Sequence, residues 1–200
     1  MKKGSLGYEI FMTALVLVVI AGVAGALLGL VNYFTAVDPD EMLARKASAV
    51  YDGDLMRMPP EEGISQPIEY KDGDVLGVYV PKDPAVHNVY VLRVLGLGAY
   101  KGSLELLVNI TDGKIAKIAK YDANETPGLG SKALEDSYFS QYCGVDLASF
   151  NGFRLVKSPA MSSDEVRAVS GASKSSTAVT NAVNAAAFWY KNTVLKGGAK

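Results

Sequence analysis

The longest hydrophobic segment lies near the start of the chain, where residues 10–37 contain no charged side chain. An α-helix rises about 1.5 Å per residue, so about 20 apolar residues cross a bilayer core of roughly 30 Å. Tyr33 and Phe34 close the segment, where an interfacial aromatic belt is expected. The pattern predicts one transmembrane helix over residues 10–34, within an anchor that spans residues 1–37.

Two other interpretations of this segment stay open. A cleaved signal peptide would explain the basic head, Lys2 and Lys3, but apolar signal regions are only about 7–15 residues long, so an uncleaved anchor is favoured. The order Gly7-Tyr8-Glu9 is similar to the start of a type IV pilin, although the pilin glutamate lies further into the mature helix. A pilin-like structural subunit therefore remains an alternative.

The transmembrane segment also suggests a partner, but not an orientation. Ala21, Gly25 and Gly29 recur every four residues and share one helix face, where small side chains let another helix approach closely. Two basic residues precede the span and two follow shortly after it, so the positive-inside rule selects neither orientation.

Residues 38–200 alternate short apolar runs with polar segments, as is typical of a folded domain. A helix is predicted over residues 39–51, because Asp38 can cap free N–H groups and Pro39 suits the first helical position. Apolar runs predict four strands, a hairpin turn at Asp112-Gly113, and two more helices. The strands cover residues 75–80, 89–94, 104–110 and 114–121, and the helices lie near 134–139 and over 178–195. Neighbouring antiparallel strands with flanking helices indicate an α+β domain.

Composition excludes several classes of function. The chain has 20 basic and 21 acidic residues, and this balance argues against general nucleic-acid binding, which needs a clustered basic excess. One cysteine excludes a disulfide framework and a thiolate metal cluster, and one histidine excludes a multi-histidine metal site. The single histidine also removes the commonest general base from most catalytic designs.

The first segment with chemical potential is residues 124–132, an exposed loop predicted after the last strand. Gly128 and Gly130 allow backbone conformations that other residues avoid, and they let a flat ligand lie against the main chain. An ordinary turn into the next helix explains the same residues, so both interpretations remain.

The second such segment is residues 170–177, which hold five hydroxyl side chains just before a long helix. Free N–H groups and the helix dipole at such a start stabilise a phosphate. A plain serine or threonine cap is the alternative, although five hydroxyls in eight residues exceed what capping requires.

Together with the anchor, Tyr100–Gly102 and the hairpin, these segments resemble a known family. The chain is similar to the FMN-binding G subunits of Rnf complexes and to the C subunits of sodium-pumping NADH:quinone oxidoreductases. The string Glu-Thr-Pro-Gly-Leu-Gly at 125–130 is quite specific, and Ser-Gly-Ala-Ser at 170–173 is weaker alone. The resemblance implies FMN joined through a phosphoester to Ser173, in a bond made by a flavin transferase. Cofactor contacts are expected from Glu125, Thr126, Gly128, Leu129, Gly130, Lys132, Ser170, Gly171, Ala172 and Ser176.

Two positions differ from the usual family pattern. Ser173 stands where the family usually has threonine, and either hydroxyl can form the ester. Arg167 stands where an acid usually lies, three residues before the first motif serine, so both covalent and non-covalent FMN remain open. Tyr100 and Tyr121 are candidates to flank a flavin ring, with core packing as the alternative.

The resemblance implies an electron-transfer subunit of an ion-translocating oxidoreductase complex, not catalytic alone. Its partners would be the other membrane and redox subunits of that complex, with no nucleic acid and no metal. Residues 38–200 would form an FMN-binding domain on the extracytoplasmic face of the inner membrane. An anchored flavin-binding accessory or sensor module outside such a complex is the main alternative.

Overall fold

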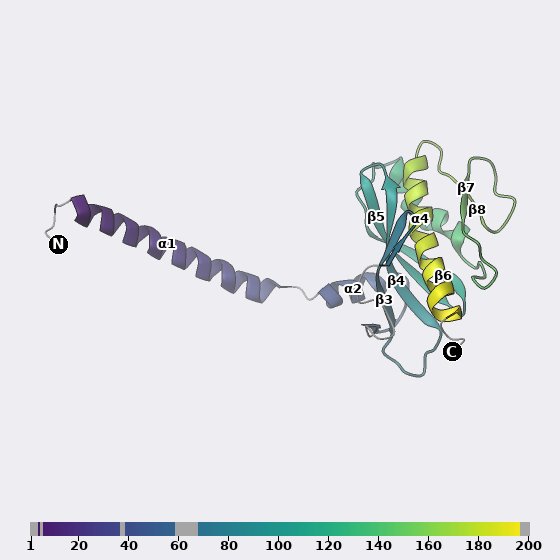
Figure 1. Ribbon diagram of the computed structural model, residues 1–200, viewed down its shortest axis with the longest axis horizontal. Coiled ribbons are helices and arrows are strands. Elements are labelled where there is room, and N and C mark those ends of the chain that lie inside the picture. The colour runs from purple at the N-terminus through teal and green to yellow at the C-terminus, as the bar shows by residue number, and fades with distance from the viewer. Residues whose placement is uncertain (1–3, 5, 37–38, 59–67, 197–200) are drawn as a thin grey trace. The chain divides into compact units, whose positions relative to one another are not determined.

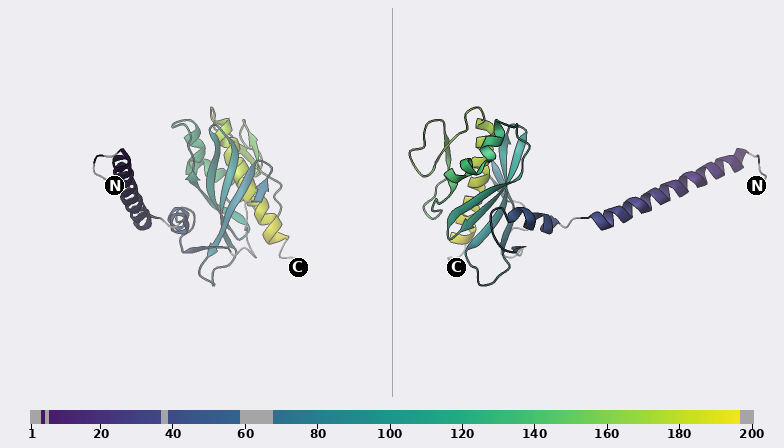
Figure 2. Two further views of the ribbon diagram at one scale, coloured as in Figure 1. Left: turned by 60° about the vertical axis from the view of Figure 1, so that its left-hand side comes forward. Right: turned by 180° about the vertical axis from the view of Figure 1, so that it is seen from behind.

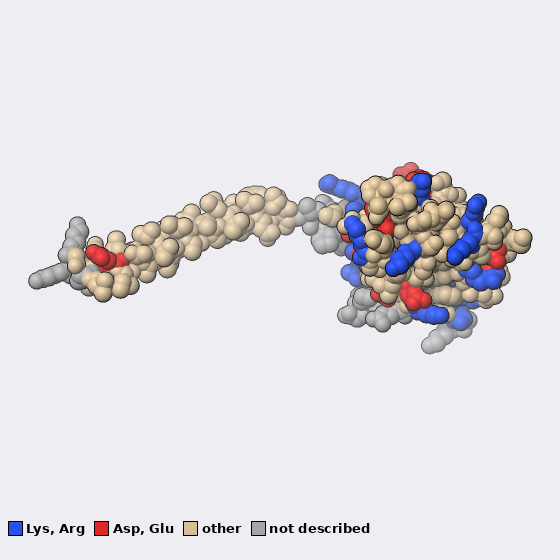
Figure 3. Space-filling model, turned by 90° about the horizontal axis from the view of Figure 1, so that it is seen from above, with Lys and Arg blue, Asp and Glu red and all other residues tan. Residues whose placement is uncertain are grey.

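The computed structural model describes residue 4 and residues 6–36, 39–58 and 68–196. The chain divides into two compact units, Met1–Glu41 and Met42–Lys200. Most of the first unit is α1, Leu6–Thr35, which is long and apolar enough to cross a membrane and buries no side chain within the protein. On the face shown in Figure 3, the uncharged surface of α1 is interrupted only near Glu9.

The two threonines of α1 bond back to the helix itself. The Thr13 hydroxyl donates to the Glu9 carbonyl at 2.8 Å, and the Thr35 hydroxyl donates to the Val31 carbonyl at 2.7 Å. A hydroxyl without a partner is costly in an apolar medium. These bonds make Thr13 compatible with the apolar surroundings predicted for residues 10–34, and Thr35 compatible with the edge of that span.

The second unit is built on an antiparallel sheet of six strands (Figures 1 and 2). Five strands lie in the order β1-β3-β4-β5-β6, and β2 pairs with β3. The strands are β1 (Leu55–Arg57), β2 (Ile68–Tyr70), β3 (Gly73–Pro81), β4 (Val89–Ala99), β5 (Gly102–Thr111) and β6 (Lys114–Asp122).

Helices cover both faces of this sheet. The long helix α4, Ser173–Tyr190, packs on one face in the main core, as Figure 1 shows, and α2, Pro39–Ala47, contributes to a smaller cluster on the other. On β5 the alternation is clear, because Leu106 belongs to the core under α4 and Leu107 to the cluster under α2. The central strands are thus buried on both sides, which explains their continuous apolar runs.

A close approach between β4 and α4 positions the start of the helix. A Cβ atom built on Gly96 would overlap the main-chain oxygen of Ala178. One on Gly73 of β3 would lie 2.8 Å from the Asn181 oxygen. These glycines let the helix backbone lie almost directly on the strands.

Between β6 and α4 the chain forms several short elements, which lie on the same side of the sheet as α4. Gly130–Leu134 and Ser140–Tyr142 are 3-10 turns that flank α3, Asp136–Phe139. β7, Arg154–Val156, and β8, Glu165–Arg167, form a separate parallel pair. A π-helical turn, Lys191–Leu195, follows α4.

The predicted fold class is confirmed, with corrections at element ends. The helix predicted over 39–51 ends at Ala47, where the Val50 N–H turns back to the Ala47 carbonyl, and Asp38 lies outside the described residues. The strand predicted over 89–94 continues to Ala99, and its added part includes Gly96, on which a Cβ atom would overlap the Ala178 oxygen of α4. The helix predicted over 178–195 begins earlier, at Ser173; its α-helical part ends at Tyr190, and the π-helical turn carries it to Leu195.

Candidate functional site

The two motif segments meet in space, at the junction between a loop and a helix start. Residues 125–130 follow β6, and residues 170–175 lead into α4. The Ser175 hydroxyl donates to the Glu125 carboxylate at 2.7 Å, and Ser175 is only 2% exposed. A Cβ atom on Gly130 would overlap that carboxylate and lie 2.7 Å from the Ser175 oxygen. Only glycine at 130 permits this junction.

A cavity of about 590 Å³ opens beside the junction, within the range of small-molecule sites. Its apolar walls include Tyr100, from the β4–β5 turn, and Leu129, and their exposed fractions of 70% and 52% show that the cavity opens to solvent. The remaining lining residues come from the two motifs: Glu125, Thr126, Gly130, Gly171, Ala172, Ser173, Lys174 and Ser175.

The hydroxyls at the start of α4 have different surroundings. Ser176 is fully buried and accepts the Val169 N–H at 3.0 Å, while the Thr177 hydroxyl donates to the Ser173 carbonyl at 2.9 Å. Ser175 is engaged by Glu125. The Ser173 side chain is exposed and lines the cavity.

The start of α4 is not capped by a side chain. Ala172 occupies the N-cap position, and within the described residues no side-chain capping hydrogen bond is made there. The serines are therefore not a plain helix cap, which was the alternative drawn from the sequence. Uncapped N–H groups at this end of an 18-residue helix favour an anion beside Ser173.

Four expected contact residues lie outside the lining of this cavity. Gly128 shapes the loop, with φ +75° and an N–H that donates to the Ser131 hydroxyl at 2.9 Å. Lys132 lies exposed in the 3-10 turn that follows, and Ser176 is buried behind the helix start. Ser170 lines a neighbouring cavity instead.

Tyr121 lies away from the site, in the cluster under α2. Its ring is 4.1 Å from the Lys46 Nζ and 4.3 Å from the Arg93 Cζ, measured to the ring centroid. Of the two tyrosines considered for a flavin ring, only Tyr100 lines the cavity.

Sequence reasoning missed a basic residue beside the site. The neighbouring cavity, of about 290 Å³, is lined by Lys157 and Arg167 as well as by Ser170, Gly171 and Ser173. Arg167 stands out in the sequence as a departure from a family pattern, but Lys157 has no signal there, because only the pairing of β7 with β8 brings the two basic residues together.

A buried tyrosine pair lies behind the start of α4. The hydroxyls of Tyr142 and Thr180 are 2.8 Å apart, and Thr180 in turn donates to the Ser176 carbonyl at 2.9 Å. Burial raises the pKa of Tyr138 and raises that of Tyr142 well above its ordinary value, so both phenols stay neutral. Burial also raises the pKa of the Cys143 thiol, which makes it a poor nucleophile.

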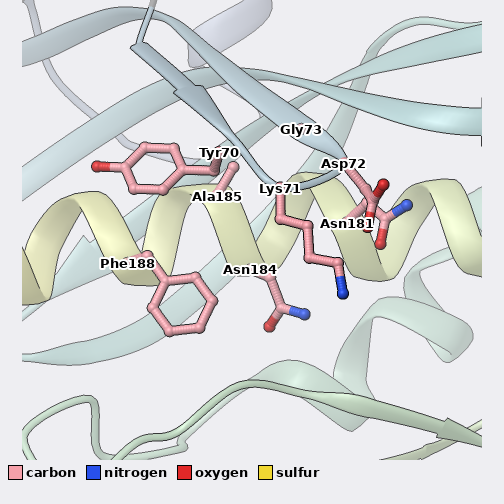
Figure 4. A pocket seen from close by; sticks show the side chains of 8 residues that line it. All are labelled: Tyr70, Lys71, Asp72, Gly73, Asn181, Asn184, Ala185 and Phe188. Atoms are coloured by element: carbon pink, nitrogen blue, oxygen red, sulfur yellow. The ribbon is translucent and has the colours of Figure 1, made fainter.

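Another cavity, of about 340 Å³, lies between the β2–β3 turn and the second half of α4 (Figure 4). The Asn184 side chain bonds both the N–H and the carbonyl of Phe153, and the Asn181 amide donates to the Leu97 carbonyl. These polar groups hold the fold together and are not free for a ligand. Among the described residues, no cluster of His, Cys, Asp or Glu is arranged to hold a metal ion.

Comparison with known proteins covers the part of the chain that holds both motifs. Residues 99–187 match the FMN-binding domain family, and this range contains both motifs. The chain is 30% identical, over 92% of both chains, to the G subunit of the Na(+)-translocating ferredoxin:NAD(+) oxidoreductase complex of Acetobacterium woodii. It is 36% identical to the G subunit of the proton-translocating ferredoxin:NAD(+) oxidoreductase complex of Clostridium ljungdahlii, over 44% of this chain and 45% of that protein.

A third relative is the C subunit of the Na(+)-translocating NADH-quinone reductase of Yersinia pestis, 32% identical over 58% of this chain and 45% of that protein. The match to the Acetobacterium protein extends well beyond residues 99–187, because it covers 92% of both chains. The chain therefore belongs to the family of the FMN-binding G subunits of Rnf complexes and their counterparts, the C subunits of sodium-translocating NADH:quinone reductases.

Proposed function

We propose that this protein is the FMN-carrying G subunit of an Rnf-type ion-translocating complex, in which it passes electrons between other subunits. One observation carries the proposal: an exposed serine hydroxyl, Ser173, stands at the uncapped start of α4 on the edge of an apolar-walled cavity. For electron transfer through a flavin, the protein must bind the flavin, tune its electrostatic surroundings and leave it accessible to redox partners. It need not supply an acid–base pair.

FMN fits these residues, and when bound it would supply the redox chemistry. In our proposal the Ser173 Oγ would attack the flavin-side phosphorus of a flavin dinucleotide, in a reaction catalysed by a flavin transferase. The phosphoanhydride bond of the dinucleotide would break, the nucleoside monophosphate would leave, and the Ser173 hydroxyl proton would be lost. The ester leaves the phosphate with one ionisable oxygen and a charge near −1. The uncapped helix start stabilises such a charge by about 0.3–1 kcal/mol when exposed, so other contacts must hold the flavin.

The protein's own part is to bind and orient the flavin. Tyr100 and Leu129 offer apolar surface for a flat ring, and Gly130 and Gly171 leave main chain accessible beside it. The Glu125 carboxylate lines the cavity and is fixed there by Ser175, and a negative charge at this place disfavours electron-rich forms of a neighbouring flavin.

The proposal includes an anchor over residues 1–37 and a domain over 38–200 on the extracytoplasmic face. Support comes from α1 and from the membrane complexes named for the relatives. The test is labelling of intact cells with an impermeant thiol reagent, using Lys82→Cys in a Cys143→Ser background. We expect labelling without breaching the inner membrane, and protection of the introduced thiol until the membrane is breached would place the domain on the other side.

The decisive experiment is production of the full-length protein with and without an active flavin transferase. We expect intact mass after denaturation to increase by an FMN phosphoester only when the transferase is present, and the denatured band to fluoresce. Absence of both signals with an active transferase would reject the covalent assignment. Co-purification with multi-span membrane subunits separates a component of the complex from an anchored accessory module.

A further inference from the structure

The cavity beside the candidate FMN site has a basic wall. It adjoins the larger cavity at Gly171 and Ser173, which line both. Lys157 and Arg167 lie on its wall, and none of its seven lining residues is acidic. The larger cavity offers apolar surface, whereas this one offers two positive charges.

The pairing of β7 with β8 places the two cations. Val156 is the register partner of Arg167, and the Ala168 N–H donates to the Val156 carbonyl at 2.8 Å, so Lys157 leaves β7 beside Arg167. The Gln141 side chain accepts the Arg167 N–H at 2.9 Å and thereby holds this residue's main chain. The backbone of Arg167 is therefore held within β8, and Lys157 directly follows the paired end of β7.

Both cations are available to a ligand. The acids at the start of β8 pair with Arg154 instead, which bonds Asp164, just before the strand, at 3.2 Å and Glu165 at 3.3 Å. Within the described part of the chain, neither Lys157 nor Arg167 forms an ion pair, and both side chains are exposed.

We propose that Lys157 and Arg167 form a phosphate subsite that binds FMN without any ester at Ser173. This inference rests on the proposed FMN function and specifies which side of the site takes the phosphate. FMN combines a flat ring with a phosphate, and the two adjoining cavities offer an apolar surface and a basic one in the same arrangement. Arginine and lysine form strong charge-assisted hydrogen bonds with phosphate oxygens. In this subsite the positive charge of Arg167 attracts the phosphate, whereas an acid at position 167 would repel it.

The test compares FMN with riboflavin, which has the same ring and no phosphate. Full-length protein is purified in detergent from cells without the transferase and titrated with each flavin by fluorescence. We expect FMN to bind about tenfold more tightly than riboflavin, both in the wild type and in Ser173→Ala. Lys157→Gln and Arg167→Gln should each weaken FMN binding several-fold, and the double variant should abolish the preference while leaving riboflavin binding unchanged.

Lys120→Gln is the matched control, because it removes one exposed positive charge on β6 and should leave the preference intact. Rising ionic strength should reduce the preference for FMN. The subsite would be overturned if the wild type bound FMN and riboflavin with equal affinity. It would also be overturned if the double variant kept the preference for FMN, or if it lost affinity for both flavins equally. If the wild type binds neither flavin, the subsite is also rejected, whereas esterification of Ser173 by the transferase is scored separately by mass.

Discussion

Ser175 donates a hydrogen bond of 2.7 Å to the carboxylate of Glu125, which lies 50 residues earlier in the chain. The bond joins the loop after β6 to the first turn of α4, and Gly130 passes beside it without room for a side chain. The two segments recognised as motifs are therefore one structural unit, and the geometry of the cavity depends on this contact.

Glu125→Ala should loosen that unit. The nearly buried Ser175 hydroxyl would lose its acceptor, so the free energy of unfolding should fall by about 1–3 kcal/mol. Urea unfolding can be followed through Trp189, the single tryptophan, which is fully buried. Glu125→Gln keeps an acceptor for Ser175 and should lose much less. Equal losses in the two variants would show that the negative charge, not the hydrogen bond, stabilises the junction.

Gly96→Ala should be among the most damaging single changes in the domain. The added methyl would overlap the Ala178 main-chain oxygen and force α4 off the sheet, at a cost of about 1–3 kcal/mol or more. The unfolding midpoint reported by Trp189 measures the loss. Gly25→Ala is the control, because a Cβ there meets nothing within 4 Å. A Gly96→Ala protein as stable as the wild type would contradict the observed helix position.

A scan of the serines tests the attachment site. Ser173→Ala should abolish the fluorescence of the denatured protein after co-production with the transferase, whereas Ser173→Thr should retain it, because either hydroxyl can form the proposed ester. Ser170→Ala is the exposed control and should keep the flavin. Ser176→Ala should keep the flavin but lose stability, because the Val169 N–H loses its acceptor. Loss in Ser170→Ala with retention in Ser173→Ala would move the site to residue 170.

Truncation should separate the anchor from the domain. A protein that begins at Asp38 should be soluble, because α1 supplies the apolar surface. A protein that begins at Tyr51 should aggregate, since Leu43 and Ala47 no longer cover Val91 and Leu107 on the sheet. Size-exclusion chromatography distinguishes these outcomes. Complete partition of the longer fragment into membranes, with no partner present, would contradict the anchor assignment.

Stability at high pH should report the buried tyrosines. The pKa of Tyr142 is raised well above its ordinary value of 10.0, so the folded protein retains a proton that the unfolded chain releases first. The contribution of protonated Tyr142 to the free energy of unfolding is therefore constant below about pH 10, and it is lost as the pH rises further. Unfolding midpoints from pH 8 to 11 should fall less steeply in Tyr142→Phe, after correction for its lost bond to Thr180. Identical slopes would contradict the burial of this phenol.

The sequence identified the elements of the domain better than their details. Strict alternation along residues 114–121 would put Ile115 and Ile118 on opposite faces of the sheet, yet both belong to the core under α4. The register shift between Asn109 and Ile110 of the neighbouring strand inserts an extra residue and reverses the alternation. Such a bulge depends on pairing between strands, which no single strand's pattern reveals.

The candidate site was predictable to a similar extent. Resemblance singled out the residues around Ser173 and Glu125, but their direct junction needed the docking of α4 on the sheet. The roles of Ser175 and Ser176 diverged because burial gave each a different partner. Lys157 could not be foreseen, since its proximity to Arg167 comes from strand pairing across a long connection.

The close packing of Gly96 against the Ala178 main chain bears on whether Ser173 can be modified before or after the domain folds. Main chain packed this closely opens only with the domain as a whole, so its amides should exchange with solvent deuterium among the slowest. Ser173 lies five residues before Ala178, about 7.5 Å along the helix axis. A modifying enzyme that meets the folded protein must therefore recognise a helix end, not an extended peptide. One that requires an extended peptide must act on the nascent chain, before α4 docks.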